Sequence, residues 1–422
     1  MDVRDPVEWL LSLTFRGIRM GLANMEALLA RLGNPQAKVP SIIVGGTNGK
    51  GTTSALIASI LSASGRRTGL YISPHVADIR ERIAVDGAPV APDDFARLAA
   101  TIRRVAAQES PIPVTFFETI TAMGFLHFAE QKLDAAVVEV GLGGLLDAVN
   151  MAPAGVAVIT SIGLDHADIL GGTLKEVAFE KLGIVKQGRP LVSGVTRPRL
   201  QAHFERSCAE KGATLYRIGR EFDVRYRKSG LTGERFDYRD DGLVLSNIKL
   251  PLVGRRQADN GALAIRAARL FAPDLSEKVI RAGVAGVKVI GRFETVRRDP
   301  LVIVDGAHNP PAVEELVKTV ARHIDRPVDL VFGAMRDKDY RAMLATLAPL
   351  CRSITLYAPP MERAAPLADL HAAVPKDFAG PVTEAASPEE VARFIDASPA
   401  DAVWLVAGSF YVVGAIRRQL VP

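Results

Sequence analysis

A glycine-rich turn between an apolar run and a helical segment constrains the fold of this chain more than any other feature. The stretch reads SIIVGGTNGKGTTSALIASIL and covers residues 41–61. Its first part, 41–46, is typical of a buried strand, and the periodicity of the later part predicts a helix over 52–65. Such a turn gathers free backbone N–H groups and the positive end of a helix dipole at one point. The stretch therefore predicts a strand–turn–helix unit of an α/β fold, able to hold a phosphate.

The spacing in this turn departs from the usual phosphate-binding loop, G-x-x-x-x-G-K-[ST]. Val44 stands where that loop has its first glycine, and Gly51 follows Lys50 directly. Glycines would let the backbone approach a phosphate, and Lys50 would neutralise its β and γ oxygens, with Thr52 or Thr53 facing a magnesium ion. Taken alone, the loop favours phosphate binding. The alternative is a plain glycine-rich turn that carries a solvated lysine.

The rest of the chain repeats this alternation of short apolar runs and longer amphipathic segments, which predicts an α/β fold with mostly parallel sheets. A length of 422 residues favours two domains, placed at 1–295 and 296–422. Polar, turn-rich sequence at 215–250 predicts a small antiparallel subsheet at the edge of the first domain. Residues 283–300 have the glycines and proline of a connector. The expected strands are 41–46, 68–73, 135–141, 156–162 and 190–195, the expected helices 52–65, 92–108 and 257–271, and the second alternation covers 301–308, 328–335, 352–359 and 401–414.

Composition narrows the class of protein. Hydrophobic residues make up 48% of the chain and charged residues 23%, as in ordinary globular proteins. The net charge of +5 is interspersed, which favours small acidic substrates over nucleic acid. Cys208 and Cys351 match no metal or redox spacing, and neither a signal peptide nor an apolar run of membrane-spanning length is present. We expect a soluble, cytoplasmic protein with no nucleic-acid or membrane partner.

Two clusters of polar residues directly follow predicted strands. Glu139 ends an apolar run before the glycine turn of VVEVGLGGLLDAVN (137–150), where an unpaired carboxylate would be costly. Asp165 and His166 follow the strand at 156–162. Each has an ordinary alternative, a glutamate paired to a lysine at a sheet edge and a structural histidine. Because α/β sites form at the carboxyl ends of parallel strands, the clusters and the glycine turn together favour a site for Mg²⁺ and a triphosphate.

A third cluster, VDGAHNPP (304–311), opens the second domain. Asp305 could accept hydrogen bonds from ribose hydroxyls and His308 could meet a phosphate. Alternatively, Asp305 and Asn309 cap local backbone donors, with the prolines starting the next helix. Lys181, within EVAFEKLGI, would ordinarily be a solvated surface lysine.

Five stretches in this order resemble the folylpolyglutamate synthase/dihydrofolate synthase family of the ATP-dependent Mur-ligase superfamily. They are GGTNGKGTTSA, SPHVADIRERI, EVGLGGLLDAVN, SIGLDHADILGGTLKEVAFEKLGI and VDGAHNP. The resemblance runs from MGLANMEALLARLGNPQ (20–36) to VAGSFYVVG (406–414). It explains the loop spacing, since Mur-type ligases use G-T-N-G-K-G-[ST]. It implies a P-loop-type ATPase domain with a mostly parallel sheet and a small antiparallel subsheet, followed by a smaller Rossmann-like C-terminal domain.

The resemblance also implies a reaction. ATP phosphorylates a carboxylate, and the amine of L-glutamate attacks the acyl phosphate to form an amide, with release of ADP and phosphate. The acceptor would be dihydropteroate, a reduced folate or a folyl-glutamate. Carboxylate and triphosphate are both anions, so cations are needed between them.

By matching residues one by one, the resemblance assigns roles in the site. The first Mg²⁺ would be held by Ser73 and Glu139, and the second by Glu139, His166 and a carbamylated Lys181. The catalytic residues would be Lys50, Lys181 and His308. ATP would contact Thr47, Asn48, Gly49, Lys50, Gly51, Thr52, Asn260, Arg292 and Asp305, and the pterin would contact Gly21, Leu22, Thr115, Phe116 and Phe117.

Some positions depart from the family pattern. Leu145 stands where arginine is common, Val149 where threonine is common, and Ala23 and Asn24 replace a usual charged pair. Arg256 replaces a histidine. These changes affect the folate-side loops more than the ATP side, so a Mur-type ligase acting on a different acid is the second reading. A non-catalytic nucleotide-binding protein that keeps the fold is a third. A site completed by two domains of one chain is compatible with a monomer.

Overall fold

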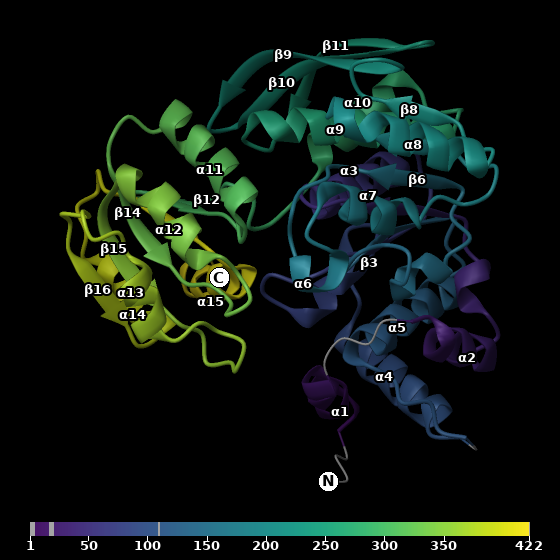
Figure 1. Ribbon diagram of the computed structural model, residues 1–422, viewed down its shortest axis with the longest axis horizontal. Coiled ribbons are helices and arrows are strands. Elements are labelled where there is room, and N and C mark those ends of the chain that lie inside the picture. Colours follow the sequence, from purple (N-terminus) through teal and green to yellow (C-terminus); the bar gives the residue numbers. More distant parts are fainter. Residues whose placement is uncertain (1–4, 17–20, 109, 422) are drawn as a thin grey trace.

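The structure is a computed structural model that describes residues 5–16, 21–108 and 110–421. Met20, where the resembling segment begins, lies outside these ranges, as do residues 1–4 and 17–19. The described strands form sheets of eight, three and six strands. Figure 1 shows two lobes, one built on the eight-stranded sheet and one, green to yellow, built on the six-stranded sheet. The α/β fold class is confirmed.

The large sheet places β1 at its centre. Its order is β4-β3-β2-β5-β1-β6-β7-β8, with parallel pairs from β2 through β8 and antiparallel pairs at β2–β3 and β3–β4. Because β1 lies between β5 and β6, the loops after these three strands meet at one edge, where ligands bind in open α/β sheets. The strands are β1 Ser41–Gly45, β2 Thr68–Tyr71, β3 Ile83–Val85, β4 Ala88–Pro89, β5 Ala135–Glu139, β6 Val156–Ile159, β7 Leu191–Ser193 and β8 Leu215–Arg217.

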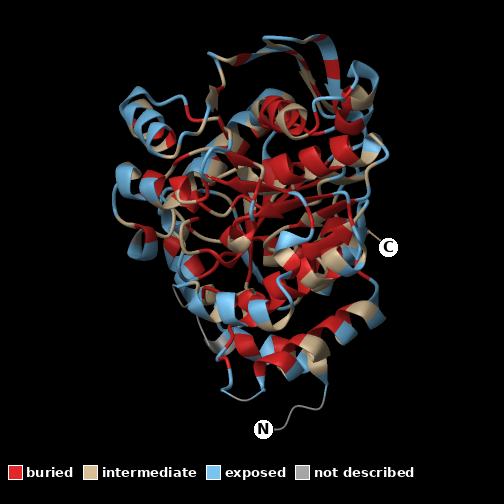
Figure 2. Ribbon diagram, turned by 90° about the vertical axis from the view of Figure 1, so that its right-hand side faces the viewer, coloured by how far each residue is buried: buried red, intermediate tan, exposed pale blue. Residues whose placement is uncertain are grey.

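Helices cover both faces of this sheet and create two cores, which appear as red segments at the centre of Figure 2. One core packs α3 (Lys50–Ala63), α9 (Arg255–Phe271) and α10 (Glu277–Gly286) against the sheet. Here α10 crosses α3 so closely that a Cβ atom on Gly283 would collide with the backbone of Ile60. The other core packs α1 (Pro6–Ser12), α2 (Ala23–Arg31), α4 (Pro92–Ala106), α5 (Phe116–Glu130), α7 (Leu174–Leu182) and α8 (Pro198–Glu210).

The predicted antiparallel subsheet is present. It consists of β9 (Phe222–Gly230), β10 (Gly233–Asp240) and β11 (Val244–Leu250), in the order β11-β10-β9. Phe236 and Tyr238 are fully buried and join the core that contains α9. The expected range began too early, since 215–217 forms β8 of the large sheet.

The third sheet has the order β12-β13-β17-β14-β15-β16, with β12 antiparallel and the other strands parallel. Apolar side chains of α11, α12 and α13 pack on one face and those of α14 and α15 on the other. The strands are β12 Glu294–Arg298, β13 Leu301–Val304, β14 Val328–Phe332, β15 Cys351–Tyr357, β16 Val382–Ala385 and β17 Val403–Ala407, and the helices α11 Pro310–His323, α12 Tyr340–Leu347, α13 Leu367–Ala373, α14 Pro388–Asp396 and α15 Phe410–Leu420. Short helical turns complete the description, α6 at Ala167–Leu170 and 3₁₀ turns at Leu13–Arg16, Pro35–Ala37, Ile79–Arg82, Ala148–Met151 and Ala348–Leu350.

Two further expectations need correction. The predicted connector at 283–300 is instead the end of α10 followed by β12, which pairs with β13 through its backbone. The helix expected from residue 52 begins at Lys50, because Gly49 takes a left-handed conformation with φ +89° directly before it. The third sheet begins one residue before the predicted boundary at 295, and we keep the domain limits as a prediction. No helix within the described ranges is long and apolar enough to cross a membrane.

Candidate active site

The glycine-rich loop between β1 and α3 is fixed by its surroundings. Gly46 and Gly49 have φ of +135° and +89°, a region that favours glycine. A Cβ atom on Gly46 would collide with Thr160 after β6, and one on Gly49 would lie 2.6 Å from Oδ1 of Asn260 on α9. The loop therefore needs glycine at both positions, for its conformation and for close packing.

Hydrogen bonds join this loop to the segment after β6. The backbone N–H of Asn48 donates to Oγ of Ser161 at 3.0 Å. The hydroxyl of Thr47 donates to the carbonyl of Gly163 at 3.1 Å and accepts from its N–H at 3.0 Å. Nζ of Lys50 donates to the carbonyl of Thr47 at 3.3 Å. The Thr47 side chain thus serves the loop's own structure, while Lys50 bends back over the loop.

A cavity of about 130 Å³ lies above this loop, at the carboxyl ends of the central strands. The large sheet and its loops supply most of its walls, and the six-stranded lobe supplies three residues. It is lined by Gly46, Thr47, Asn48, Gly49, Lys50, Gly51, Ser73, Pro74, Glu139, Gly141, Leu142, Gly143, Asp165, His166, Leu170, Lys181, Arg292, His308 and Phe410. The predicted metal and catalytic residues therefore converge on one cavity. Thr52, Asn260 and Asp305 are not among its lining residues.

Glu139 is the buried acid of this cavity. It ends β5, is 4% exposed, and accepts a hydrogen bond from the N–H of Ser73 at 2.9 Å. Burial raises the pKa of its carboxyl group, and the nearby Lys50 ammonium opposes that rise. A Cβ atom on Gly51 would lie 3.4 Å from Oε2 of Glu139, so the carboxylate lies directly beside the glycine-rich loop, called the phosphate loop below for its predicted role. A buried carboxylate in that position is suited to a hard cation.

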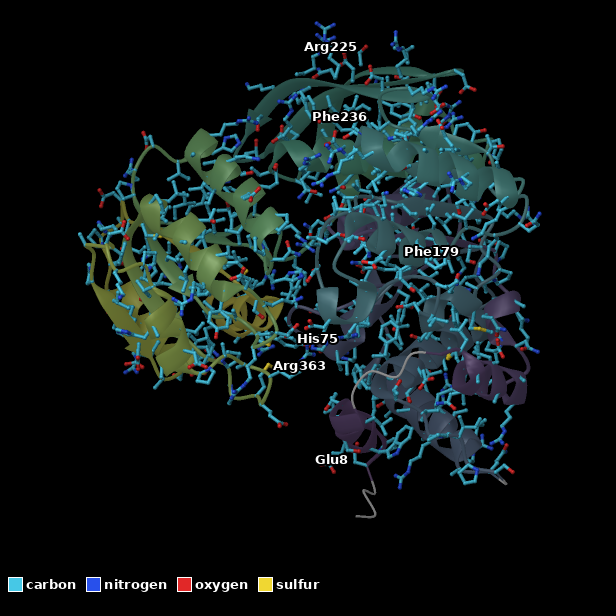
Figure 3. All side chains as sticks on the ribbon, viewed as in Figure 1. Glu8, His75, Phe179, Arg225, Phe236 and Arg363 are labelled. Atoms are coloured by element: carbon cyan, nitrogen blue, oxygen red, sulfur yellow. The ribbon has the colours of Figure 1, made fainter. Side chains whose placement is uncertain are left out.

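Lys181 points inward from α7. It is 4% exposed, whereas its neighbour Phe179 on the same teal helix is 68% exposed (Figure 3). Burial, helped by the nearby charge of Lys50, lowers the pKa of the Lys181 amine to about 7. The alternative of a solvated surface lysine is therefore wrong. At neutral pH a large fraction of this amine is uncharged.

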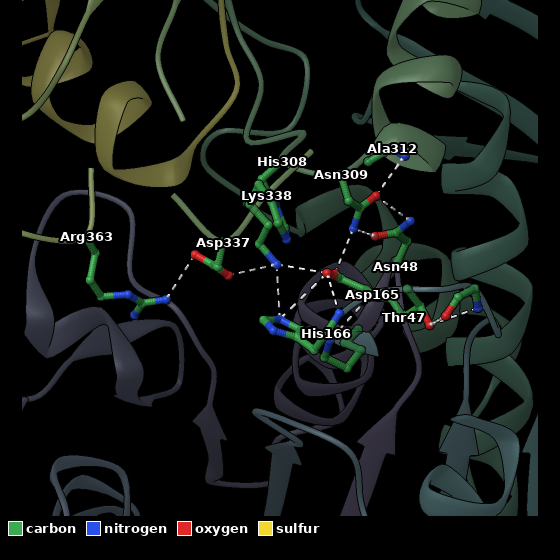
Figure 4. A network of polar contacts seen from close by, with 12 residues as sticks. Thr47, Asn48, Asp165, His166, His308, Asn309, Ala312, Asp337, Lys338 and Arg363 are labelled. Atoms are coloured by element: carbon green, nitrogen blue, oxygen red, sulfur yellow. Dashed lines mark hydrogen bonds and ion pairs between the residues drawn. The ribbon is translucent and has the colours of Figure 1, made fainter. Parts of the chain in front are cut away.

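Asp165 and His166 follow β6, and His166 has a φ of +54°. Their side chains meet Lys338, which comes from the loop after β14 in the other lobe (Figure 4). Nζ of Lys338 donates to Oδ1 of Asp165 at 2.8 Å and to Nε2 of His166 at 3.1 Å. Burial alone would raise the pKa of Asp165, but the Lys338 ammonium lowers it to about 2. No local pattern in the sequence indicates Lys338, since 173 positions separate it from Asp165.

Asn309 forms another contact between the lobes. Its Oδ1 caps α11 by accepting from the N–H of Ala312 at 3.0 Å, so the capping reading of this residue is confirmed. Its Nδ2 donates to Oδ2 of Asp165 at 3.0 Å and to Oδ1 of Asn48 at 3.2 Å. Nδ2 of Asn48 donates back to Oδ1 of Asn309 at 3.3 Å. The phosphate loop is thereby joined directly to the six-stranded lobe.

His308 and Arg292 enter the cavity from the same lobe and share an aromatic neighbour. The His308 ring lies 5.5 Å from the ring of Phe410, and the Arg292 guanidinium carbon lies 4.5 Å from that ring. Nδ1 of His308 donates to the carbonyl of Gly306 at 2.8 Å. Burial lowers the pKa of His308 to about 4, so the imidazole is neutral at pH 7 and Nε2 is left as an acceptor.

The carboxylate oxygens of Asp305 accept hydrogen bonds from nearby backbone N–H groups. Its Oδ2 accepts from the N–H of Phe293 and its Oδ1 from the N–H of Ala307, each at 2.8 Å. The local-capping reading of this carboxylate is confirmed. Its contact with a nucleotide stays a prediction.

The residues predicted to meet the pterin lie outside the cavity lining. Gly21 and Leu22 precede α2, and Thr115 caps α5. The Thr115 hydroxyl donates to Oε2 of Glu118 at 2.8 Å and accepts from its N–H at 3.2 Å, which occupies this buried side chain.

The two predicted phenylalanines at the start of α5 are partly buried. A Cβ atom on Gly141 would lie 2.5 Å from Cζ of Phe117, so that ring lies against the glycine turn that lines the cavity. The same ring meets Tyr71 edge to face at 6.3 Å. The guanidinium of Arg82 lies 5.3 Å from the ring of Phe116. Phe117 is therefore the nearer of the two to the cavity.

The described residues contain no group of three or more His, Cys, Asp or Glu side chains able to hold a metal ion by themselves. Mg²⁺ commonly takes one or two carboxylates and completes its shell with water and substrate phosphates. Glu139 beside the phosphate loop fits that pattern. A cation bound here would therefore also need ligands other than His, Cys, Asp and Glu side chains, such as water or substrate phosphates.

The chain matches two family models in succession. Residues 44–268 match the Mur ligase middle domain and residues 291–410 match the Mur ligase glutamate ligase domain. The lobes that meet at the cavity are therefore those of a Mur ligase.

Comparisons over the full length are more specific. A dihydrofolate synthase/folylpolyglutamate synthase of Bacillus subtilis is 34% identical over 99% of both chains. A folylpolyglutamate synthase of Lacticaseibacillus casei is 36% identical over 93% of this chain and 92% of its own length. This chain belongs to the folylpolyglutamate synthase/dihydrofolate synthase family, whose members are ATP-dependent ligases.

Solved structures agree with this placement. A Mycobacterium tuberculosis folylpolyglutamate synthase complexed with ADP superimposes with a TM-score of 0.90, at 33% identity over 99% of both chains. Escherichia coli FolC in complex with DHPP and ADP has a TM-score of 0.88, at 32% identity over 99% of this chain and 97% of that one. The fold predicted from the sequence resemblance is confirmed.

Proposed function

We propose that this chain joins L-glutamate to the carboxylate of dihydropteroate, of a reduced folate or of a folyl-glutamate, converting ATP to ADP and phosphate. The names of its relatives support both activities, that of a dihydrofolate synthase and that of a folylpolyglutamate synthase. The Escherichia coli complex with DHPP and ADP supports a site that takes a nucleotide together with a second small ligand.

The reaction has two chemical steps. A carboxylate oxygen of the acceptor attacks the γ-phosphorus of ATP, which forms an acyl phosphate and releases ADP. The amine of L-glutamate then attacks the acyl carbon, and phosphate leaves as the amide forms. Closure of the site between two lobes would keep water from the acyl phosphate.

One observation carries this proposal, the convergence of the phosphate loop, Glu139, Lys181 and His308 on one cavity between the lobes. Lys50 would neutralise charge on the β and γ phosphates. The neutral imidazole of His308 would offer Nε2 as an acceptor near the γ-phosphate. Arg292, Asn260 and Asp305 would complete the nucleotide contacts, with the local role of Asp305 retained.

We assign the magnesium positions to the same side chains. Ser73 and Glu139 would hold the first ion, and Glu139, His166 and carbamylated Lys181 the second. Magnesium bound there would neutralise charge between the triphosphate and the acceptor carboxylate. The uncharged fraction of Lys181 supports the carbamate, because only a neutral amine can add to CO₂. Carbamylation would turn this lysine into an anionic ligand and remove the cost of burying an ammonium.

The remaining expectations complete the proposal. The pterin would reach the cavity past Gly21, Leu22 and the start of α5, where Phe117 lies against the glycine turn. The protein would act as a monomer in the cytoplasm on small molecules, without a nucleic-acid partner.

A different acid as acceptor is the second candidate, and Leu145 is the position that favours it. Its N–H donates to the carbonyl of Glu180 at 2.9 Å, and a Cβ atom on Gly183 would lie 2.5 Å from its Cα. Leu145 thus packs against the helix of Lys181, where the family commonly has an arginine. The loss of that charge would alter recognition of an anionic acceptor. By contrast, Arg256 pairs with Asp259 and Glu315 away from the cavity.

ADP release measured with dihydropteroate, with tetrahydrofolate and with neither, all with ATP and L-glutamate, decides between the two candidates. We expect stimulation by at least one pterin acceptor, and no stimulation by any pterin would refute the folate assignment. Lys50→Ala should abolish nearly all turnover, whereas Lys228→Ala on the exposed face of β9 should leave it unchanged. Near wild-type activity in Lys50→Ala would refute the role of Lys50.

A further inference from the structure

Lys338 forms an ion pair between the two lobes directly beside a proposed metal ligand, His166. Its Nζ lies 2.8 Å from Oδ1 of Asp165 and 3.1 Å from Nε2 of His166, and its side chain is only 9% exposed. Asp337 contributes a longer ion pair to the same ammonium at 3.6 Å. Lys338 is therefore a buried cation that crosses from the six-stranded lobe to the large sheet (Figure 4).

The loop that carries Lys338 is held in place on its own lobe. The N–H of Lys338 donates to the carbonyl of Met335 at 3.1 Å, and the N–H of Arg336 donates to the carbonyl of Arg363 at 2.9 Å. The Asp339 side chain then caps α12 by accepting from the N–H of Ala342 at 3.0 Å. These contacts present the ammonium from a fixed turn, so its position reports the position of the whole lobe.

The contact between Lys338 and Nε2 of His166 prevents a metal ion from binding at that nitrogen. An ammonium has only donors, so Nε2 of His166 must be the acceptor and use its single lone pair for Lys338. A divalent cation bound to His166 through Nε2 needs that same lone pair. It would also lie within a few ångströms of the ammonium, where like charges repel strongly at a buried site. Lys338 and a cation at Nε2 of His166 cannot be present together.

We propose that Lys338 is a positioning residue that competes with the second divalent cation for His166. Filling the cation site would then release the contact that Lys338 makes between the lobes. This inference rests on the proposed placement of a cation at His166, with Nε2 as the ligand atom. The contacts of Asn309 with Asn48 and Asp165 do not involve Lys338, so they would hold the lobes together at the phosphate loop when the lysine leaves. Cation binding then changes the position of one lobe relative to the other without separating them.

The test measures Mn²⁺ binding in the absence of nucleotide by electron paramagnetic resonance. Lys338→Met keeps the length of the side chain and removes its charge, and should bind Mn²⁺ roughly tenfold more tightly than the wild type. Lys338→Arg keeps the charge and should stay within about threefold of the wild type. Lys318→Met is the matched control, since Lys318 is exposed on α11 and pairs with Glu315. The double variant Lys338→Met/His166→Ala should lose the gain.

Hydrogen–deuterium exchange of residues 335–339 supplies a second measurement. In the wild type, Mn²⁺ should speed exchange in this loop, whereas in Lys338→Met exchange should be fast with or without the ion. Unchanged Mn²⁺ affinity in a folded Lys338→Met protein would overturn the competition, as would a gain that persists in the double variant. Pterin-dependent ADP release is measured on the same wild-type sample. If this ADP release is absent, the result counts against the proposed function. If it is present while Lys338→Met binds Mn²⁺ with unchanged affinity, only the role proposed for Lys338 is refuted.

Discussion

The backbone N–H of Ser73 donates a hydrogen bond to Oε2 of Glu139 at 2.9 Å, and this contact joins the loop after β2 to the end of β5. The acceptor is a buried carboxyl group whose pKa is raised by burial, beside the Lys50 ammonium that opposes the rise. The fold thus holds an acid in a place where its charge is costly until a cation arrives. That cost is typical of functional sites, where charge is arranged for a ligand and not for stability.

Glu139→Gln should lose at least about a hundredfold in turnover while the protein remains folded, because the amide keeps an acceptor for Ser73 but binds Mg²⁺ poorly. The stabilisation from a raised carboxyl pKa is present below the unfolded value of about 4.5 and is lost as pH rises through the folded value. The free energy of unfolding of Glu139→Gln, relative to the wild type, should therefore increase from pH 5 to pH 8 without Mg²⁺. Urea unfolding at both pH values, with ADP release on the same samples, measures this. Wild-type turnover in the variant would contradict the metal assignment.

Lys181 should carry a carbamate that forms more fully as pH rises through about 7, the value to which burial lowers the pKa of its amine. Protein equilibrated with ¹³C-bicarbonate should show a carbamate carbonyl signal by NMR that grows between pH 6 and pH 8. The signal should be missing in Lys181→Met and present in Lys175→Met, a control on the exposed side of the same helix. A wild-type spectrum without the signal at pH 8 would refute the carbamate while leaving the folate ligase proposal standing.

The sequence predicted the α/β alternation and the edge of the sheet where the site lies, because strand and helix periodicity are local properties. It did not predict which side of α7 faces the cavity. In VAFEKL the apolar Phe179 is exposed and Lys181 is buried, the reverse of what hydrophobicity alone favours. The strand β12 was missed because its residues ETVRR are half-exposed and mostly polar. The contact between Lys338 and Asp165 depends on how two lobes meet, which no local pattern encodes.

The turn after β5 depends on glycine because of Phe117. A Cβ atom on Gly141 would lie 2.5 Å from Cζ of that ring, so Gly141→Ala should cost roughly 1–3 kcal/mol in the free energy of unfolding through overpacking. In a Phe117→Ala background the same change should cost less than about 0.5 kcal/mol, since the colliding ring is gone. Denaturant unfolding of the four proteins of this double-mutant cycle measures the coupling. Additive costs would show that Phe117 does not pack against the turn in solution.

His308 should make the protein less stable in acid. Burial lowers the pKa of its imidazole from 6.5 to about 4, so below pH 6.5 the unfolded chain takes up a proton that the folded protein resists. The stability contributed by the neutral ring is present above pH 6.5 and is lost as pH falls through about 4. His308→Gln removes this titration, and its free energy of unfolding relative to the wild type should shift in its favour by roughly 2 kcal/mol between pH 7 and pH 4.5. Urea unfolding at half-unit pH steps measures the difference, in which the other histidines cancel because both proteins contain them. A difference that stays constant across this range would mean that the His308 ring is accessible to protons in the folded protein, and the neutral acceptor proposed for the γ-phosphate would have to be another group.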